Sequence, residues 1–501
     1  SPPPRPPGAL GLRYFVWMRS LISSLTSGCR AALAAAPVLG LLFGLLPARL
    51  TAQERVTLKV AATTDVHGRL RGWDYAAGRA DSSRGLAHAA SIVDSLRRVA
   101  RNRVILVDAG DLLQGNAMTF VAGRIDSLAP HPVVAAMNLM RYDAAAVGNH
   151  EFNYGLGVFD RAVQQARFPF LAANTRRLDG GHQYPGRTMV TRAGVKVAII
   201  GATTPGSMVW DRDNLRGRLV VDDIVAALPA QVDSARRDGA DVVIVVAHAG
   251  LDELTSYDTA ATGLASENPM ARVAREVKGI DAIVIGHSHR EMADSTINGV
   301  LIVQPRNWAT SVSVTTLELE RRGGRWTLVS KRGETVQARG WPEQRALVRA
   351  VERAHQAALR YSTAVIGRTS EAWITDSARM VDRPMIDLIQ EVQRRESGAE
   401  LSIASVFTTD ARFEAGNITV ERLVALYPYE NTLRALKLSG AQIRAHLEYT
   451  NRYWVVTRAA DGSFSVRNDP SIPGYNYDVL AGLDYTVDLS RPMGQRITRL
   501  E

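Results

Sequence analysis

The 501-residue sequence predicts a layered α/β domain, a connecting helix and a second, smaller α/β domain. Three observations support this order. Short apolar runs alternate with helical stretches between residues 56 and 332, residues 342–361 have the spacing of one amphipathic helix, and helix and strand patterns mix after residue 363. A chain of this length exceeds one ordinary domain and is long enough to bury two cores. We place the domains at 53–338 and 363–501, with the connecting helix within 339–362.

Residues 1–52 are interpreted as upstream sequence and a secretory signal peptide. Arg19 and Arg30 precede an apolar run at residues 31–46, and small residues follow it up to Ala52, where cleavage is expected. The alternative, an uncleaved anchor, is disfavoured because the run is short for a membrane span. We therefore expect a periplasmic or secreted protein with no membrane contact beyond the signal peptide.

Charge and cysteine content limit the partners and the source of stability. Cys29 is the only cysteine, so the mature chain has no disulfide and must depend on large cores, to which a bound metal can add stability. Residues 1–52 carry five Arg and no Lys, Asp or Glu, so their removal lowers the net charge from +10 to +5. This mild excess favours anionic small ligands and does not indicate a nucleic-acid polymer. The oligomeric state stays open.

The first domain repeats one pattern, in which an apolar run ends in a polar cluster. VTLKVAATTDVHG, RVILVDAGD, AAAVGNHE, VKVAIIGATTP, DVVIVVAHAG and DAIVIGHSH all have it. Continuous apolar strands indicate sheets that are buried on both faces. Ligands of such folds bind beyond the carboxyl ends of the strands, where these polar clusters stand.

Seven residues with metal-ligand side chains fall at five predicted strand ends: Asp65, His67, Asp111, Asn149, His248, His287 and His289. One histidine at a strand end is ordinarily just hydrogen-bonded, but the chain has only ten histidines and this coincidence is hard to reach by chance. Residues i and i+2 of an extended segment point to the same side, so the Asp65/His67 and His287/His289 pairs are each expected to reach one point.

The number and type of these ligands predict two divalent ions. Seven are too many for one tetrahedral ion, and they suit two ions about 3.5–4 Å apart that share a carboxylate. Nitrogen and oxygen donors without thiolate favour Zn, Mn, Fe or Co over Ca or Mg.

The rest of the chain predicts the connecting helix and the second domain. Leu347, Val351, Ala354 and Ala358 lie at helical spacing, and Pro342 is expected in the first turn of that helix. Beyond it, RPMIDLIQEVQRRESG has a helical pattern, whereas LRALKLSG and LDYTVDL are strand-like.

The motifs DVHG, GDLLQG, GNHE, HAG and GHSH, in this order, resemble the calcineurin-like metallophosphoesterase family. YPYENTL and IPGYNYD resemble the substrate-binding domain of the bacterial 5′-nucleotidase group. Within that group, GNHEFNYG and IPGYNYD are most similar to the 2′,3′-cyclic-nucleotide 2′-phosphodiesterase/3′-nucleotidases. The resemblance implies a four-layer αββα sandwich followed by a substrate domain. It also implies an incomplete C-terminal domain, because the family usually continues beyond a strand like YTVDL.

The resemblance also implies roles for the site residues. One ion would be held by Asp65, His67, Asp111 and His289, and the other by Asp111, Asn149, His248 and His287, with Asp111 as the bridge. His150 would stabilise the transition state and help the leaving oxygen depart. Asn153 would orient His150, although 5′-nucleotidases usually have an Asp there, and a structural role is at least as plausible as a catalytic one for Glu151.

The implied substrate-binding residues are Asn149, Tyr429, Asn431 and Tyr475. Tyr429 and Tyr475 would sandwich the nucleobase by stacking, with Tyr477 as the alternative to Tyr475. In the competing interpretation Tyr429 and Tyr475 are both core tyrosines.

The predicted function is hydrolysis of 2′,3′-cyclic nucleotides and 3′-nucleotides by a two-metal enzyme. The alternatives are a 5′-nucleotidase or UDP-sugar hydrolase on the same scaffold, a sulfur-compound hydrolase of the same superfamily, and a non-catalytic nucleotide-binding envelope protein. The complete set of metal ligands disfavours the non-catalytic protein.

Overall fold

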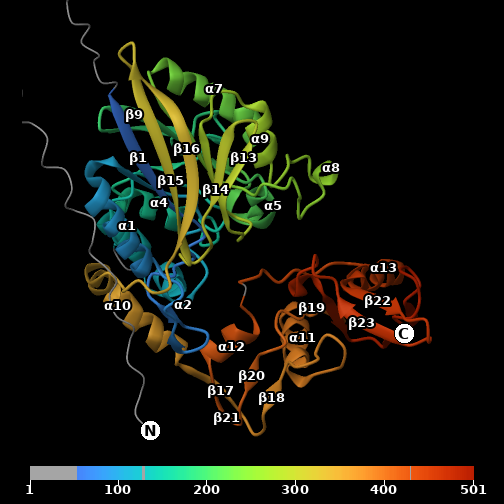
Figure 1. The fold of residues 1–501 in the computed structure, drawn as a ribbon. Coiled ribbons are helices and arrows are strands. Elements are labelled where there is room, and N and C mark those ends of the chain that lie inside the picture. Colours follow the sequence, from blue (N-terminus) through green and yellow to red (C-terminus); the bar gives the residue numbers. More distant parts are fainter. Residues whose placement is uncertain (1–53, 127–129, 429) are drawn as a thin grey trace, which may run out of the picture. The chain divides into compact units, whose positions relative to one another are not determined.

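The computed structural model describes residues 54–126, 130–428 and 430–501. They form a large domain with two six-stranded sheets and, after it, a region of short two-stranded pairs (Figure 1). The predicted signal peptide and Tyr429 lie outside the described residues. None of the helices in the described part of the chain is long and apolar enough to cross a membrane.

The first sheet has the strand order β16-β15-β1-β4-β5-β6. Its strands are β1 Arg55–Thr63, β4 Val104–Asp108, β5 Ala144–Ala146, β6 Phe170–Leu171, β15 Ser311–Arg322 and β16 Arg325–Gln337. Strands β1, β4, β5 and β6 are parallel to one another, whereas β15 and β16 are antiparallel. The parallel strands therefore deliver their carboxyl ends to one edge of the sheet.

The second sheet has the order β13-β14-β12-β11-β9-β8. Its strands are β8 Arg187–Arg192, β9 Val195–Thr203, β11 Val242–His248, β12 Ala282–Ile285, β13 Met292–Ile297 and β14 Val300–Gln304. Its central strands β9, β11, β12 and β14 are parallel. Every residue of β11 and β12 is buried, as their unbroken apolar runs predict.

Three apolar layers confirm the predicted four-layer αββα sandwich. Between the sheets, side chains of β1 and β4 pack against those of β9 and β11. The helices α1 Leu86–Ala100, α3 Pro132–Met140, α4 Leu156–Gln165 and α10 Arg345–Ser362 cover the outer face of the first sheet. The helices α7 Ile224–Arg237 and α9 Met270–Glu276 cover that of the second. In Figure 1, α1 (blue) and α7 (green) lie on opposite sides of the paired sheets.

Helix α10 lies within residues 339–362, where a helix was predicted, and it packs in the core of the first domain. Its residues Leu347, Val351, Ala354 and Ala358 are buried in the cluster that contains α1 and α3. The expectation for Pro342 was wrong, because the helix begins only at Arg345. Gln344 caps the helix by accepting a hydrogen bond from the Leu347 N–H.

The second domain contains three α-helices and five two-stranded pairs in its described part. The helices are α11 Pro384–Ser397, α12 Val420–Leu426 and α13 Gly440–Thr450. The pairs are β17 Val365–Thr369 with β21 Gly416–Thr419, β18 Trp373–Ile374 with β20 Arg412–Phe413, β19 Ser402–Ser405 with β24 Asp478–Ala481, β22 Trp454–Arg458 with β23 Phe464–Asn468, and β25 Tyr485–Val487 with β26 Ile497–Leu500.

Two of the three patterns predicted in this domain are confirmed. The helical pattern forms α11, and LDYTVDL contains β25. The strand predicted for LRALKLSG was wrong, since residues 431–439 have no regular structure. No strand of the described residues pairs with them, and Leu433 and Leu436 are 44% and 75% exposed. Apolar alternation without a pairing partner does not make a strand.

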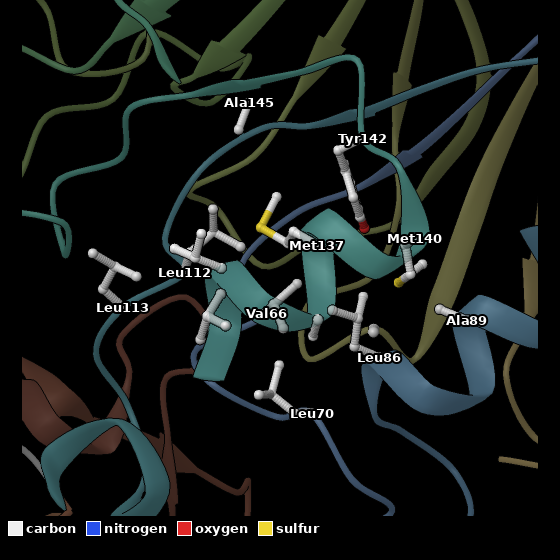
Figure 2. Packing of buried hydrophobic residues seen from close by; sticks show 14 of the residues in the cluster. Val66, Leu70, Leu86, Ala89, Leu112, Leu113, Met137, Met140, Tyr142 and Ala145 are labelled. Carbon is white, nitrogen blue, oxygen red and sulfur yellow. The ribbon is translucent and has the colours of Figure 1, made fainter. Parts of the chain in front are cut away.

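Buried apolar residues anchor the turns that follow β1 and β4. Val66, Leu112 and Leu113 are at most 1% exposed and belong to the same cluster as Met137 and Met140 of α3 (Figure 2). They are sequence neighbours of the predicted ligands. The core therefore fixes the backbone from which those ligands project.

Candidate metal centre and active site

The seven predicted ligands come together where the parallel strands of both sheets end. They follow or end β1, β4, β5, β11 and β12: Asp65, His67, Asp111, Asn149, His248, His287 and His289. Hydrogen bonds join the sheets at this point. His248 Nδ1 lies 2.7 Å from the Ala109 carbonyl, and the His287 N–H lies 3.1 Å from both Asp65 carboxylate oxygens.

Five of these seven residues have a positive φ: Asp65 (49°), His67 (47°), Asp111 (62°), His287 (70°) and His289 (54°). Non-glycine residues rarely adopt this conformation, and each costs about 1–3 kcal/mol unless its surroundings impose it. The expected extended alternation was therefore wrong as an explanation of the two i, i+2 pairs. Left-handed turns after β1 and β12, and not continued strands, bring the members of each pair together.

Backbone hydrogen bonds hold the turn after β1 against the turn after β4. The Asp65 N–H donates to the Gly110 carbonyl at 2.8 Å, and the His67 N–H donates to the Asp111 carbonyl at 2.9 Å. Gly148 of the GNHE motif lies so close that a Cβ there would stand 2.3 Å from the Asp111 backbone nitrogen. The motif therefore needs glycine at this position for close approach.

One group of ligand atoms comes from Asp65, His67 and His289, all within 4.8 Å of one another. His67 Nε2 lies 3.1 Å from His289 Nε2, and His289 Nε2 lies 3.4 Å from Asp65 Oδ1. His67 Nδ1 faces the Gln114 carbonyl at 2.8 Å, and a carbonyl only accepts hydrogen bonds. The proton of His67 is therefore on Nδ1, and the unprotonated Nε2 can bind a metal.

The second group comes from Asp111, His248 and His287. His248 Nε2 lies 3.0 Å from Asp111 Oδ2 and 3.1 Å from the amide oxygen of Asn149. The Ala109 carbonyl holds the proton of His248 on Nδ1, so Nε2 faces the two oxygens. Asn149 thus lies with this group, as predicted.

Asp111 lies between the two groups. Its carboxylate is 2% exposed, and its Oδ2 lies 3.8 Å from His67 Nε2 and 3.8 Å from His150 Nε2. It also forms a ligand group with His67 and His150. This position suits a carboxylate that bridges two ions.

The charges of the site favour a cation. Burial lowers the pKa of His67 to about 3, so its ring is neutral. Burial opposes ionisation of Asp111, but His248 and His150 hold its pKa well below the usual range. Burial also opposes protonation of His248, but the adjacent Asp111 carboxylate raises its pKa to about 10. The buried carboxylates therefore attract positive charge strongly.

The donor set fits divalent transition metals. Imidazole nitrogens, carboxylate oxygens and an amide oxygen converge here, and a cation that displaces the proton of His248 stabilises such a cluster. Nitrogen and oxygen donors without thiolate favour Zn, Mn, Fe or Co.

His150 and Asn153 lie together beside Asp111. His150 Nδ1 is 2.5 Å from Asn153 Oδ1, and the His150 N–H donates to Asp111 Oδ1 at 2.9 Å. The side chain of His150 is 33% exposed. It is thus within reach of a substrate, whereas its opposite edge is held by Asn153.

Glu151 holds the backbone around the site. Its buried carboxylate accepts hydrogen bonds from the backbone N–H groups of Asp111, Leu112, Leu113 and Gly148, at 2.6 to 3.2 Å. It contacts no described ligand side chain through these bonds. The structural interpretation of Glu151 is therefore favoured.

Glu151→Ala is expected to lower the free energy of unfolding by more than about 2 kcal/mol, because it leaves buried N–H groups unpaired. Urea unfolding followed by circular dichroism measures the change. Glu396→Ala, at an exposed position of α11, is the control and should fall within about 0.5 kcal/mol of the parent. Equal stability of the two variants would contradict the structural role.

Two residues of the site were missed by sequence reasoning. Glu267 Oε1 lies 2.8 Å from His287 Nε2, which leaves His287 Nδ1 for a metal. Asp211 Oδ1 accepts a hydrogen bond from Asn153 Nδ2 at 2.9 Å. Neither residue stands at a strand end. In the sequence each is only an acidic residue in a segment between secondary-structure elements, and such residues are ordinarily solvated.

The tyrosines of the second domain differ in exposure. Tyr475 is 48% exposed, whereas Tyr477 is 6% exposed and packs against Tyr453 and Trp454. Tyr477 is therefore a core residue, and its ring faces offer no platform for a base. Asn431 is exposed and donates to the Tyr427 hydroxyl at 3.3 Å.

Comparisons with known proteins agree with this architecture. Residues 58–291 match the calcineurin-like phosphoesterase family, and residues 365–501 match the 5′-nucleotidase C-terminal domain. The 5′-nucleotidase precursor from Thermus thermophilus has a TM-score of 0.62 at 24% identity, over 89% of this chain and 85% of that chain. The similarity to this solved structure shows the fold.

Two relatives are similar at the level of sequence. The trifunctional nucleotide phosphoesterase protein YfkN of Bacillus subtilis is 29% identical over 491 residues, which are 88% of this chain and 33% of YfkN. This chain thus spans about a third of YfkN. A crystal structure of calcineurin-like phosphoesterase YfkN has a TM-score of 0.57 at 31% identity, over 62% of this chain and 99% of that chain. The 2′,3′-cyclic-nucleotide 2′-phosphodiesterase/3′-nucleotidase of Yersinia enterocolitica is 29% identical, over 87% of this chain and 74% of the relative.

Proposed function

The chain belongs to the calcineurin-like phosphoesterases that carry a 5′-nucleotidase C-terminal domain, and from this premise we propose that it hydrolyses 2′,3′-cyclic nucleotides and 3′-nucleotides with two divalent metal ions. One observation carries the proposal. Asp111 lies between two groups of metal-ligand side chains, with His150 beside it. This is the arrangement that in-line attack on phosphorus requires.

The ligand groups support one assignment of residues to ions. Asp65, His67 and His289 would hold one ion, His248, His287 and Asn149 would hold the other, and both would share Asp111. When bound, the ions would supply an activated water and offset negative charge on the phosphoryl oxygens. Zn, Mn, Co and Fe all suit these donors.

His150 acts on the leaving oxygen. Its Nδ1 is occupied by Asn153, so Nε2 is the nitrogen that meets the substrate. With protons on both ring nitrogens, it donates the Nε2 proton to the oxygen that leaves phosphorus. The side-chain amide of Asn149 also binds the phosphoryl group of the substrate.

The reaction consumes one water in each of two steps. The first water breaks the bond between phosphorus and O2′ of the cyclic ester, and O2′ takes up the proton to give a 3′-nucleotide. The second breaks the bond to O3′ and yields nucleoside and phosphate. The same metal centre serves both steps, because both are attacks on phosphorus.

The choice of substrate rests on relatives and on the second domain. The Yersinia relative is named for cyclic-nucleotide and 3′-nucleotide hydrolysis, and YfkN for several nucleotide phosphoesters. A 5′-nucleotidase or UDP-sugar hydrolase is the second candidate, favoured by the match of residues 365–501 to the 5′-nucleotidase C-terminal domain. Tyr429, Tyr475 and Asn431 bind the nucleoside part in either case. Residues 1–52 direct export to the periplasm or the medium in this proposal.

Metal content separates an enzyme from a nucleotide-binding protein that only kept the fold. After expression with ample Mn or Co, elemental analysis should find about two transition-metal ions per chain, and chelation should abolish turnover. A metal-free protein under these conditions would contradict the proposal that the chain is an enzyme.

Tyr475→Ala is expected to raise KM by about tenfold or more while kcat changes little, because base stacking contributes about 1–3 kcal/mol. Steady-state kinetics on 3′-AMP measure both constants. Tyr449→Ala, which removes a tyrosine that is 57% exposed on α13, is the control and should leave KM unchanged. Equal KM values for both variants would contradict a stacking role of Tyr475.

A further inference from the structure

The side chain of Asp211 is buried behind Asn153. Asp211 joins α5 Ser207–Trp210 to α6 Arg212–Leu215 and is 4% exposed. Its Oδ1 accepts the hydrogen bond from Asn153 Nδ2 at 2.9 Å, whereas its Oδ2 is buried with no hydrogen-bond partner among the described residues. Burial raises its pKa to about 6, so it is ionised at pH values well above about 6. A buried carboxylate with one free oxygen is costly to keep unless it has a task.

The chain of contacts from Asp211 to His150 has a defined direction. An ionised carboxylate only accepts hydrogen bonds, so the Asn153 atom that faces Asp211 must be the amino group Nδ2. The other end of the amide, Oδ1, then faces His150 Nδ1 at 2.5 Å. An amide oxygen also only accepts, so His150 must carry a proton on Nδ1.

Asn153 alone does not set this direction. The two ends of an asparagine amide are nearly equal in size, and a flip of the amide would present Nδ2 to His150. His150 Nδ1 would then have to accept a hydrogen bond, and in the neutral ring the proton would move to Nε2. Only a group with fixed polarity on the far side of Asn153 excludes this arrangement, and Asp211 is that group.

The neighbours of Asp211 hold the same loop. Asn214 Nδ2 donates to the Phe152 carbonyl at 2.9 Å, and Phe152 is fully buried. The Asn214 N–H in turn donates to the Asp211 carbonyl at 2.9 Å. The turn at residues 211–214 therefore fixes both the backbone before Asn153 and the amide of Asn153 itself.

We infer that Asp211 is a positioning residue for His150. Asp211 acts through the Asn153 amide, which holds the His150 ring with a proton on Nδ1 and with Nε2 directed toward the substrate. The inference rests on the proposed function for its effect on turnover. Its effect on the His150 tautomer does not depend on turnover.

Kinetics of Asp211→Asn test the inference, since this change keeps the volume but removes the fixed polarity. We expect kcat on 3′-AMP to fall about 10- to 100-fold, with KM within about twofold and unchanged metal content. Asp213→Asn, two residues away with a 65% exposed side chain that pairs with Arg434, is the matched control and should retain kcat. Parent-like kcat in Asp211→Asn would overturn the inference.

Exchange of the two side chains gives a second test. Asn153→Asp alone places a second carboxylate against Asp211 and is expected to lose at least as much kcat as Asp211→Asn. The double variant N153D/D211N restores one carboxylate and one amide in reversed order, and it should recover most of kcat. A merely structural role of Asp211 predicts no such recovery, so a double variant as slow as the product of the single effects would contradict the inference.

The tautomer is measured directly by ¹⁵N NMR of the metal-free protein labelled at histidine, with the His150 signals identified by their loss in His150→Gln. The parent should show one His150 tautomer with the proton on Nδ1, and Asp211→Asn should show both tautomers in exchange. An unchanged spectrum would overturn the inference. If the parent protein shows no turnover, the proposed function fails, but this spectrum still decides the role of Asp211.

Discussion

Asp111→Asn is expected to lower kcat by at least about a thousandfold, because it removes the negative charge and one of the two oxygens of the carboxylate that the proposed ion sites share. Asp111 Oδ2 lies 3.0 Å from His248 Nε2 and 3.8 Å from His67 Nε2, so it is the contact that joins the two ligand groups. The variant should also bind fewer than two ions per chain. Both kcat and bound metal are measured on the same preparation.

The matched control for Asp111→Asn is Asp108→Asn. Asp108 is also fully buried and lies three positions earlier, but burial raises its pKa well above the usual range. Its oxygens bond the Thr63 hydroxyl and the Gly110 N–H at 2.5 and 2.8 Å. A neutral amide can replace it with little effect on kcat or metal. Comparable activity of Asp111→Asn and the parent would exclude the two-metal mechanism.

His150→Ala is expected to lower kcat on 3′-AMP by about 10²–10⁴-fold while both ions stay bound, because the general acid is lost and the ion ligands are kept. The loss should be much smaller on p-nitrophenyl phosphate, whose leaving group departs without a proton. Parallel kinetics on the two substrates measure this difference.

His182→Ala is the control for that experiment, since His182 is exposed and belongs to neither ligand group. It should match the parent on both substrates. An equal loss on both substrates in His150→Ala would contradict proton donation and leave only charge stabilisation. Loss of metal from the variant would contradict the separation of His150 from the ion ligands.

Short-range sequence patterns were sufficient to predict a layered α/β domain and a site at its strand ends, whereas the four-layer sandwich was implied by the family resemblance. Strands such as β11, buried along their whole length, appear as continuous apolar runs, and each parallel strand ends in a polar cluster. Parallel strands place these ends at one edge of each sheet, and the packing of the two sheets brings Asp111 and His248 together although they are far apart in sequence.

The sequence was insufficient where contacts between loops decide the outcome. Left-handed turns at Asp65 and His287 depend on hydrogen bonds between loops, and residue type alone does not predict a positive φ at a given Asp or His. Asp211 and Glu267 were missed for the same reason, since only the folded chain shows that they face Asn153 and His287. LRALKLSG has strand-like alternation, but a strand also needs a neighbour to pair with.

Burial also decides between residues of one motif that the sequence leaves equal. Tyr475 and Tyr477 are two apart in IPGYNYD, and both have the aromatic face that stacking needs. Packing against Tyr453 and Trp454 makes Tyr477 part of the core. Tyr475 is left as the residue of this motif for the proposed base platform.

The central claim is tested most directly by phosphate release from the chain beginning at Gln53, supplied with Mn or Co, on four substrates with and without EDTA. The substrates are 2′,3′-cyclic AMP, with a coupled phosphatase to detect ring opening, 3′-AMP, 5′-AMP and a UDP-sugar. The account predicts chelator-sensitive turnover that is fastest on the first two. Faster turnover of 5′-AMP or the UDP-sugar would contradict the proposed substrate, and turnover that EDTA leaves unchanged would contradict the metal centre itself.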